Sequence, residues 1–589
     1  MQVIGLSNKS TWNQPVKQTK SKSMWISGIL PGSIFILLSS LAIYFFYRAY
    51  QTRKLQQLKE ELEAAWAREE SRFRDMERIG AYSNHMKTPE HLDARSRKWM
   101  TDLNMDAIFS KLDRCSTKIG QQYLYAMLQH PLKDQQELEI RNTGINFFEQ
   151  QKESRLAAQI ELQRLNRQLS YSIPNIIFNW KLETGPNKWL VSILSLLPIV
   201  IIALCIWVSK AYVLLLALSF FINLLFHYQN KSRVEFFISP FSQIPALRTC
   251  ALRLGKVDKH FRRKEVLAAC DKLTAFGRYQ FLLHSEKPGQ NDFSAFLWLF
   301  LEYIKITFLV EINLLDRCLE ISRSAKNEIH TLYKYIGELD SYQSIASYRA
   351  GLNYYCTPEF DNSKAQIAIK DAFHPLIEPC EANSLVTGTK GMLITGSNMS
   401  GKTTFIRTIA INAILAQTIY TVCAKQYQSS FLNVYTSIGI QDNLLEGKSY
   451  YKEELDAIQY FVQQADTTKG FNLFVMDELF KGTNTMERIA GAKGVLQYLI
   501  KGNNLVMVAT HDLELADLLS SAYSLYHFEE SVEDGGYVFD YKLKKGVLKS
   551  RNAIRLLEVS GFPAEIVGAA NAYLDMEQAS AQTLKNSHA

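Results

Sequence analysis

The stretch GMLITGSNMSGKTTFIR, Gly391 to Arg407, decides the fold. An apolar run leads into a glycine-flanked polar loop, and a helical pattern begins at Lys-Thr-Thr. The loop fits the pattern G-x-x-x-x-G-K-[ST], in which glycines let backbone N–H groups close around phosphate oxygens at a helix amino terminus. A strand, a phosphate-binding loop and a helix in this order predict an α/β P-loop domain with a mostly parallel sheet.

The loop carries the predicted nucleotide ligands. Lys402 is expected to reach the terminal phosphates of ATP, and the Thr403 hydroxyl is expected to hold Mg²⁺. The residues around these two are expected to contact the nucleotide through their backbone or side chains. The predicted cofactor-binding residues of the loop are Gly396, Ser397, Asn398, Met399, Ser400, Gly401, Lys402, Thr403 and Thr404.

Two later apolar runs end in polar residues of the kind that nucleotide hydrolysis needs. LFVMDE delivers two adjacent carboxylates, of which Asp477 is predicted to complete the Mg²⁺ shell and Glu478 to orient or deprotonate the attacking water. NLVMVATH ends at His511, which is placed to sense the γ-phosphate or that water. Thr403 and Asp477 are thus the predicted metal ligands, and Glu478 and His511 are the predicted catalytic residues.

Two other apolar regions predict membrane segments. Trp25 to Tyr47 has no charged residue and can cross a hydrocarbon core of about 30 Å. A cleaved signal peptide is the alternative, which the length of the stretch and the missing small-residue cleavage site disfavour. Trp189 to Phe226 is interrupted by one charge, Lys210, and predicts a hairpin of two spans, with a buried hairpin of a soluble core as the alternative.

Basic residues predict how these segments are oriented. They flank both outer ends of the hairpin, while its tip holds Lys210 alone, so both ends are expected in the cytoplasm and the tip outside. Three spans then require an outside amino terminus, which conflicts with four lysines there, although more basic residues follow the first span. The predicted location is the inner (cytoplasmic) cell membrane, as a multi-pass protein with a cytoplasmic ATPase domain.

Composition sets wider limits. The chain has 589 residues, too many for one hydrophobic core, so two to four domains are expected. The formal charge of +8, from 66 basic and 58 acidic residues, is spread along the chain and permits nucleic-acid binding without demanding it. The eight cysteines show no metal-ligand spacing, which fits a reducing cytosol.

Together these motifs resemble the MutS family of DNA mismatch-repair ATPases. TGSNMSGKTTFIRTIAINAILAQ is similar to the family's TGPNMGGKST segment, MDELFKGTNT to its DE-x-GRGTST, and VATHDLEL to its ATH-x-x-x-L. IGIQDNLLEGKSYYKEEL resembles the segment whose serine reaches the nucleotide of the partner subunit, and the matching residue here is Ser449. Ser397 and Ser400 replace the family's proline and glycine, and Lys481 stands where the family has arginine, yet ATP use is still expected.

The resemblance extends beyond these motifs to about 105–170 and 235–575. Met105 to Asn142 is similar to the start of the family's helical core, and GVLKSRNAIRLLEVSGFPAEIVGAANAYL resembles its closing helix-turn-helix, by which members dimerise. The resemblance therefore implies a homodimer with composite ATP sites. The family's mismatch-reading and connector domains are not expected here, because the predicted membrane span and the charged helix occupy that part of the sequence. Phe147-Phe148-Glu149 mimics the F-x-E wedge, but it lies in the helical core and is interpreted as a coincidence.

The predicted fold class is an ABC-type α/β P-loop ATPase domain joined to an all-α lever or core domain, which a transmembrane hairpin interrupts, with one amino-terminal transmembrane helix. The predicted organisation is a tail (1–24), a transmembrane helix (25–47), a charged juxtamembrane helix and linker (48–100), the first part of the helical core (101–188), the hairpin (189–228), the second part of the core or lever (229–350), the ATPase domain with carboxyl-terminal dimerisation helices (351–575) and a tail (576–589).

The leading functional hypothesis is a membrane-anchored homodimeric ATPase whose cycle moves a helical lever that holds duplex DNA. The alternative is a membrane mechanochemical scaffold that acts on a protein partner without DNA. RLGKVDKHFRRKEV is the best candidate for phosphate contacts, and a solvated helix face is its competing interpretation. A transporter-type ATPase is disfavoured, because three spans make a poor path and EGKSYYKEEL replaces the Ser-Gly-Gly signature. The candidate phosphate contacts are Lys256, Lys259, Arg262, Arg263 and Lys264.

Overall fold

The computed structural model describes residues 22–86, 97–166, 168–178, 187–274, 292–388, 390–397, 399–439, 450–467, 469–533, 536–547, 554 and 561–573. Two predicted site residues, Asn398 and Ser449, lie outside these ranges, and so does part of the predicted dimerisation segment. The chain divides into two compact units, residues 1–64 and residues 65–589.

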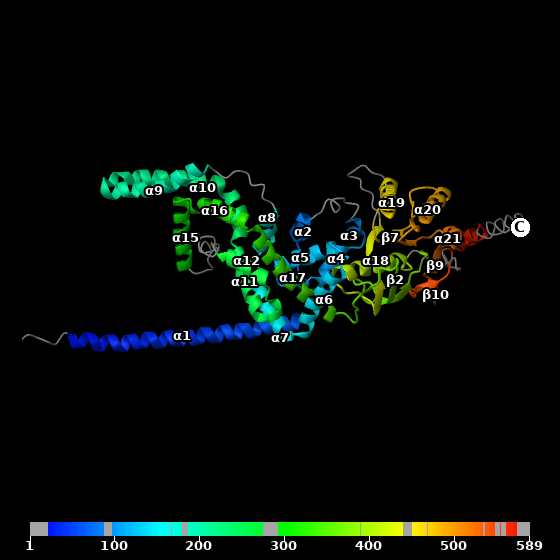
Figure 1. The fold of residues 1–589 in the computed structure, drawn as a ribbon, viewed down its shortest axis with the longest axis horizontal. Coiled ribbons are helices and arrows are strands. Elements are labelled where there is room, and N and C mark those ends of the chain that lie inside the picture. Colours follow the sequence, from blue (N-terminus) through cyan, green and yellow to red (C-terminus); the bar gives the residue numbers. More distant parts are fainter. Residues whose placement is uncertain are drawn as a thin grey trace, which may run out of the picture. The chain divides into compact units, whose positions relative to one another are not determined.

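A single helix dominates the first unit. α1 (Lys22–Ala65) covers the whole of the predicted amino-terminal span and the first part of the charged stretch behind it (Figure 1). Its 44 residues correspond to about 66 Å of helix, roughly twice the thickness of a hydrocarbon core. Ile43 and Phe46, near the end of the apolar stretch, are exposed. The helix is as the sequence indicated, and its crossing of a membrane stays a prediction.

The helical core of the second unit packs around one long helix, α17 (Lys326–Ala350). Nearly every residue of α17 from Tyr335 onward is buried, and it contacts α5, α6, α11 and α12. Short 3-10 turns at Gln168–Ser172 and Lys259–Phe261 connect some of these helices. The other helices of the core are α2 (Met76–His85), α3 (Lys98–Asp102), α4 (Met105–Leu112), α5 (Lys118–Gln129), α6 (Gln135–Gln150), α7 (Lys152–Gln163), α8 (Ile173–Phe178), α11 (Ile244–Val257) and α12 (Lys264–Lys272).

A buried carboxylate ties α17 to the start of α5. Asp340 accepts hydrogen bonds from the backbone N–H groups of Ser116 and Thr117, at 2.8 and 2.7 Å, and from the Thr117 hydroxyl. The Thr117 hydroxyl in turn accepts from Gly120 N and caps α5. A Cβ atom on Gly120 would lie 2.1 Å from the Asp340 carboxylate, so only glycine allows this close approach. The segments before and after the hairpin therefore form one core.

The hairpin consists of α9 (Lys188–Trp207) and α10 (Val213–Phe241), joined by a turn at Lys210–Tyr212. Two stretches, Lys188–Trp207 and Lys210–Lys231, are long and apolar enough to cross a membrane. Most of their large apolar side chains are exposed, which is unlike the core helices of a soluble protein. The hairpin is present as predicted, and its insertion into a bilayer stays a prediction.

Two further helices, α15 (Asp292–Thr307) and α16 (Val310–Ser324), pack against the base of the hairpin. The Asn223 amide of α10 donates to the backbone oxygens of Leu194 and Thr307, at 3.0 and 2.7 Å. Asn313 of α16 donates to the Ser195 hydroxyl of α9 at 2.7 Å. The sequence placed this region in the lever. In the structure these amides also bond it to the hairpin, so α9, α10, α15 and α16 form one packed group of helices, the bundle.

The remaining residues form an α/β domain with three sheets. The main sheet has six strands in the order β12-β9-β4-β8-β7-β6, all parallel except β12. This confirms the predicted mostly parallel sheet, but the smaller sheet, β1-β5-β2-β3, is largely antiparallel and was not predicted. The strands are β1 (Glu359–Phe360), β2 (Ile367–Ala372), β3 (Asn383–Val386), β4 (Gly391–Thr395), β5 (Gln426–Ser429), β6 (Leu432–Ser437), β7 (Phe471–Asp477), β8 (Asn504–Ala509), β9 (Tyr523–His527), β10 (Glu530–Glu533), β11 (Gly536–Phe539) and β12 (Lys544–Lys545).

Helices cover both faces of the main sheet. Successive residues of β7 alternate between two cores: Val475 packs on the side of α18 (Lys402–Thr418), and Phe474 packs on the side of the later helices. This alternation is expected of a strand that is buried on both faces. The first core is continuous with the helical core around α17. The helices of the second face are α19 (Tyr450–Thr467), α20 (Thr485–Leu499) and α21 (Leu513–Leu519).

Candidate functional site

The phosphate-binding loop leaves the main sheet at the end of β4 and enters α18. Gly396 has φ +152°, and a Cβ there would approach Ser400 Oγ and Phe528 O to 2.8 and 2.9 Å. Gly401 has φ +103° immediately before the first turn of α18. Both glycines are therefore required by the backbone, and they direct the amino terminus of α18 into the pocket. Ser400 braces the loop by donating its hydroxyl to Ser397 O at 2.8 Å.

Lys402 is buried within the loop that it serves. Its Nζ donates to the carbonyl oxygens of Gly396 and Ser397, at 2.9 and 2.7 Å. Burial lowers the pKa of Lys402 to about 8, although the carboxylates of Asp477 and Glu478 act in the opposite direction. A phosphate that replaces these carbonyls as the hydrogen-bond acceptor of Lys402 would place a full negative charge beside the buried ammonium.

The predicted metal ligands meet at one edge of the main sheet. β4, β8 and β7 are parallel neighbours, so their carboxyl ends lie at the same edge. The Thr403 hydroxyl donates to Asp477 Oδ2 at 2.8 Å. A hydroxyl and a carboxylate are hard oxygen ligands of the kind that Mg²⁺ takes together with nucleotide phosphates. The residues present thus fit the expected ion.

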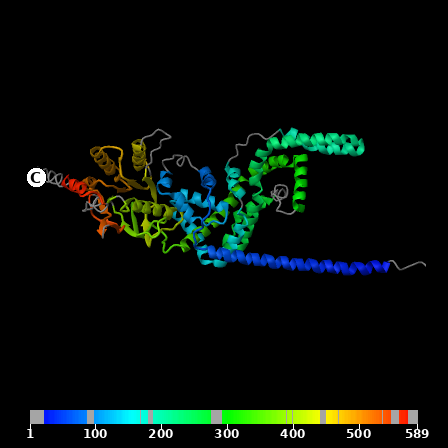
Figure 2. The ribbon, with the colours of Figure 1, turned by 180° about the vertical axis from the view of Figure 1, so that it is seen from behind.

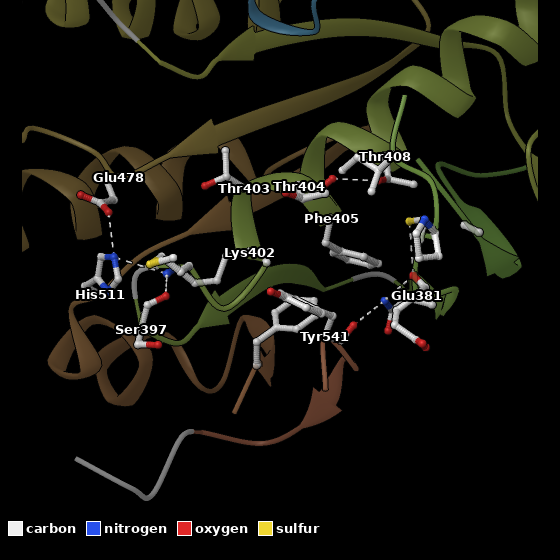
Figure 3. A pocket seen from close by; sticks show the side chains of 18 residues that line it. Glu381, Ser397, Lys402, Thr403, Thr404, Phe405, Thr408, Glu478, His511 and Tyr541 are labelled. Atoms are coloured by element: carbon white, nitrogen blue, oxygen red, sulfur yellow. Dashed lines mark hydrogen bonds and ion pairs between the residues drawn. The ribbon is translucent and has the colours of Figure 1, made fainter. Parts of the chain in front are cut away.

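The predicted catalytic residues also meet, as Figure 3 shows. His511 Nε2 lies 3.0 Å from Glu478 Oε1 and 3.3 Å from Lys402 Nζ. One ring nitrogen cannot donate to the carboxylate and accept from the ammonium together. Because ionised Glu478 only accepts, we assign the proton to His511 Nε2, and Lys402 bonds the loop carbonyls instead.

A second cation holds the other oxygen of Glu478. Lys481 Nζ lies 2.8 Å from Glu478 Oε2. Burial acts to raise the pKa of Glu478, but hydrogen bonds from His511 and Lys481 outweigh it and bring that pKa down to about 2. Glu478 is therefore ionised throughout the physiological range. The sequence marked Lys481 as a departure from the family pattern but gave it no role.

Glu454, near the start of α19, holds the loop that carries Glu478 and Phe480. It is buried, and one of its carboxylate oxygens accepts the backbone N–H of Phe480. Glu478 and Phe480 both have left-handed backbones, with φ +52° and +59°, a conformation that costs free energy in residues other than glycine. Glu454 is thus a positioning residue that the sequence analysis missed. In the sequence, Glu454 is one acidic residue on an amphipathic helix. This pattern is too common to mark a functional residue.

The pocket continues beyond the phosphate loop, with a volume of about 500 Å³. Its lining includes Ile377, Pro379 and Tyr541, none of which the sequence singled out. Figure 3 shows Tyr541 beside the phosphate loop. This volume lies within the range of small-molecule sites, and the combination of an apolar wall and a few convergent polar groups is typical of them. Met399 and Thr404 also line the pocket, as predicted for the loop.

Comparison with known proteins agrees with this geometry. Residues 392–577 match the model of MutS domain V. Among curated proteins, "MutS protein homolog 4" of Homo sapiens is 32% identical over 287 residues, which cover 45% of this chain and 29% of that protein. "DNA mismatch repair protein MutS" of Staphylococcus haemolyticus is 29% identical over 289 residues, 47% of this chain and 32% of that protein. The chain thus matches about a third of the length of these relatives.

The lowered pKa of Lys402 makes nucleotide binding sensitive to pH. Below about pH 8 the ammonium is charged before the phosphates arrive, whereas above it the protein must first take up a proton. Nucleotide phosphates are already ionised above about pH 7. We therefore expect the affinity for ATP to fall by up to about tenfold per pH unit above pH 8. Calorimetric titration between pH 6.5 and 9.5 measures this, and the Lys402→Ala variant should bind ATP at no pH. Unchanged affinity in that variant would remove Lys402 from the phosphate site.

Proposed function

This chain belongs to the MutS family, and we propose that it is a membrane-anchored ATPase that works as a homodimer. The convergence of five predicted residues at one edge of the main sheet carries this proposal. Lys402 would bind the terminal phosphates, Thr403 and Asp477 would hold Mg²⁺, and Glu478 and His511 would act on the attacking water. The bound ion would offset the negative charge that the phosphates develop.

The low pKa of Glu478 favours one of its two expected roles. A carboxylate with a pKa of about 2 is a weak base at neutral pH, so it is poorly suited to deprotonate water. It can still accept a hydrogen bond and hold the water in line with the bond that breaks, which is the main requirement of phosphoryl transfer. As the water oxygen bonds to the γ-phosphorus, the bond to the β–γ bridging oxygen breaks. The proton of the water then passes to the released phosphate.

A dimeric site would complete this arrangement. The resemblance assigns Ser449 of the partner subunit to the nucleotide, and α19 begins directly after that segment. Glu454 on α19 holds the loop that carries Glu478, so movement of the segment would reach the catalytic loop through one helix. Nucleotide binding would close such a dimer, and hydrolysis would reopen it.

The hairpin supports a cytoplasmic-membrane location. Its exposed apolar side chains are suited to lipid, and the core that joins the segments before and after it requires both of its ends on one side of the membrane. The ATPase domain would then face the cytoplasm with the hairpin tip outside. The amino-terminal α1 would supply the third span.

Duplex DNA is the load that the family relationship favours, and a protein partner is the second candidate. Lys256, Lys259, Arg262 and Lys264 are exposed, and none of them forms an ion pair with another described residue. Arg263 differs from these four, since it pairs with Glu338 at 2.8 Å and is less available for phosphate. Four of the five predicted phosphate contacts, all except Arg263, therefore remain available for DNA.

Replacement of Glu478 by glutamine tests the ATPase assignment. Glu478→Gln removes the charge but keeps the shape, so we expect ATP binding to persist while turnover falls by at least about 100-fold. Phosphate release and nucleotide binding would be measured on protein in nanodiscs. Glu514→Gln, an exposed carboxylate on α21, is the matched control and should turn over ATP normally. Normal turnover in Glu478→Gln would exclude the proposed role of this residue.

Salt-dependent binding distinguishes the two candidate loads. If DNA is held through the exposed cations, the logarithm of affinity for duplex should fall with the logarithm of salt concentration. Replacing both Lys259 and Arg262 by glutamine should reduce that slope by about 2. Asp271→Asn, at an exposed position of α12, is the control. It shows whether a substitution on this surface that removes no cation changes the slope. Absence of duplex binding at physiological salt, with and without ATP, would favour a protein partner.

A further inference from the structure

The described side chains of α15, from Leu299 to Thr307, include exposed apolar residues and a buried lysine, which is the reverse of the pattern expected in water. Leu299, Phe300 and Tyr303 are 60%, 54% and 49% exposed. Lys305, on the same helix, is only 6% exposed and pairs with Glu302 and Glu311 at 3.1 and 3.3 Å. Water favours charged groups outside and apolar groups inside. A helix that buries its lysine and exposes a leucine and two aromatic rings has an outer face suited to an apolar medium.

This face continues onto the hairpin. The Tyr303 ring stacks on Phe220 of α10, with centroids 4.7 Å apart. One turn further along, Asn223 of α10 donates to Thr307 O at the end of α15. α15 is therefore fixed to the hairpin by a ring contact and a buried hydrogen bond, and its exposed rings adjoin those of α10.

The length of α9 places these contacts within the bilayer boundary. α9 has 20 residues, about 30 Å of helix, so all of it is needed to cross a hydrocarbon core. Leu194 and Ser195, which lie at the level where α10, α15 and α16 pack, are roughly 10 Å along the helix from Lys188. Interfacial helices insert their apolar faces about 5–10 Å into the boundary between headgroups and acyl chains. A hairpin that spans the membrane must carry α15 to that depth.

The orientation of α15 relative to the hairpin also fits a position at the membrane surface. In Figures 1 and 2, α15 runs across the direction of α9 and α10 and does not continue along it. If the hairpin crosses the membrane along its own length, a helix at its base that runs across it lies along the membrane surface. Tyr303 on its outer face is of the residue type that is enriched at the membrane–water interface.

We propose that α15 is a membrane-interface helix, whose Leu299, Phe300 and Tyr303 face rests in the headgroup and upper acyl region of the cytoplasmic leaflet. This rests on the proposed insertion of the hairpin. The bundle would then hold the protein at a fixed depth and angle, since one element crosses the bilayer and another lies on it.

Depth-dependent fluorescence quenching tests the proposal. An environment-sensitive fluorescent amino acid would be placed by stop-codon suppression at Phe300, in full-length protein in vesicles of phosphatidylcholine and phosphatidylglycerol. Lipids with a spin label near the headgroup, or deep in the acyl chain, would serve as quenchers. The same probe at Ile199, an exposed apolar residue of α9, reports hairpin insertion, and at Met486, an exposed apolar residue of α20, reports the aqueous state.

We expect the shallow label to quench the probe at 300 at least about twofold more than the probe at 486, and more than the deep label does. A probe at 300 that behaves like the one at 486, while the probe at 199 is quenched by the deep label, would overturn the interface helix and leave the hairpin intact. Deep quenching at 300 would overturn it in favour of a span. Shielding at 300 from aqueous iodide without lipid quenching would overturn it in favour of a second copy. No lipid quenching at 199 would overturn the hairpin proposal as well.

Discussion

One fully buried guanidinium joins the helical core to the ATPase domain. Arg349, at the carboxyl end of α17, donates to Asn142 and Asn146 of α6, at 2.9 Å each. The same side chain donates to the Thr421 hydroxyl and to Tyr420 O, at 2.8 and 2.9 Å, just beyond the end of α18. A buried charge is tolerated only where such bonds satisfy it, and the loss of a partner would leave it uncompensated. The helix that begins at the phosphate loop is thereby fixed to α17.

α17 in turn connects the domain of the phosphate loop with the bundle that α15 and α16 form with the hairpin. Its carboxyl end is held by Arg349, its middle by Asp340, and its amino end follows directly on α16 of the bundle. A second connection runs through Asp102 of α3, which accepts from the Thr436 hydroxyl and from Ile438 N at the end of β6. Both connections bond core helices to the α/β domain that carries the phosphate loop. In the proposed ATPase cycle, these packed, hydrogen-bonded elements would carry a change at the phosphate loop to the lever and the bundle.

Local sequence predicted which residues meet at the phosphate loop, because they belong to short motifs at strand ends; their roles toward ATP stay predictions. Lys402, Thr403, Asp477, Glu478 and His511 needed only the order of parallel strands to be brought together. Contacts between distant segments left no such pattern. The Lys481 clamp, the Glu454 support and the pocket wall at Tyr541 depend on tertiary packing of common residue types. The sequence also showed the helical periodicity of α15 and α16. It did not show that they pack on the hairpin, because that contact depends on single amides, Asn223 and Asn313.

Hydrogen exchange of α15 and α16 tests the central claim most directly, that nucleotide state is transmitted along α17. The Glu478→Gln variant in nanodiscs would be followed with and without ATP, and exchange at the phosphate loop would confirm that ATP is bound. The account predicts that ATP also changes the exchange of backbone amides in α15 and α16. Protection at the phosphate loop together with unchanged exchange throughout α15, α16 and α17 would contradict it.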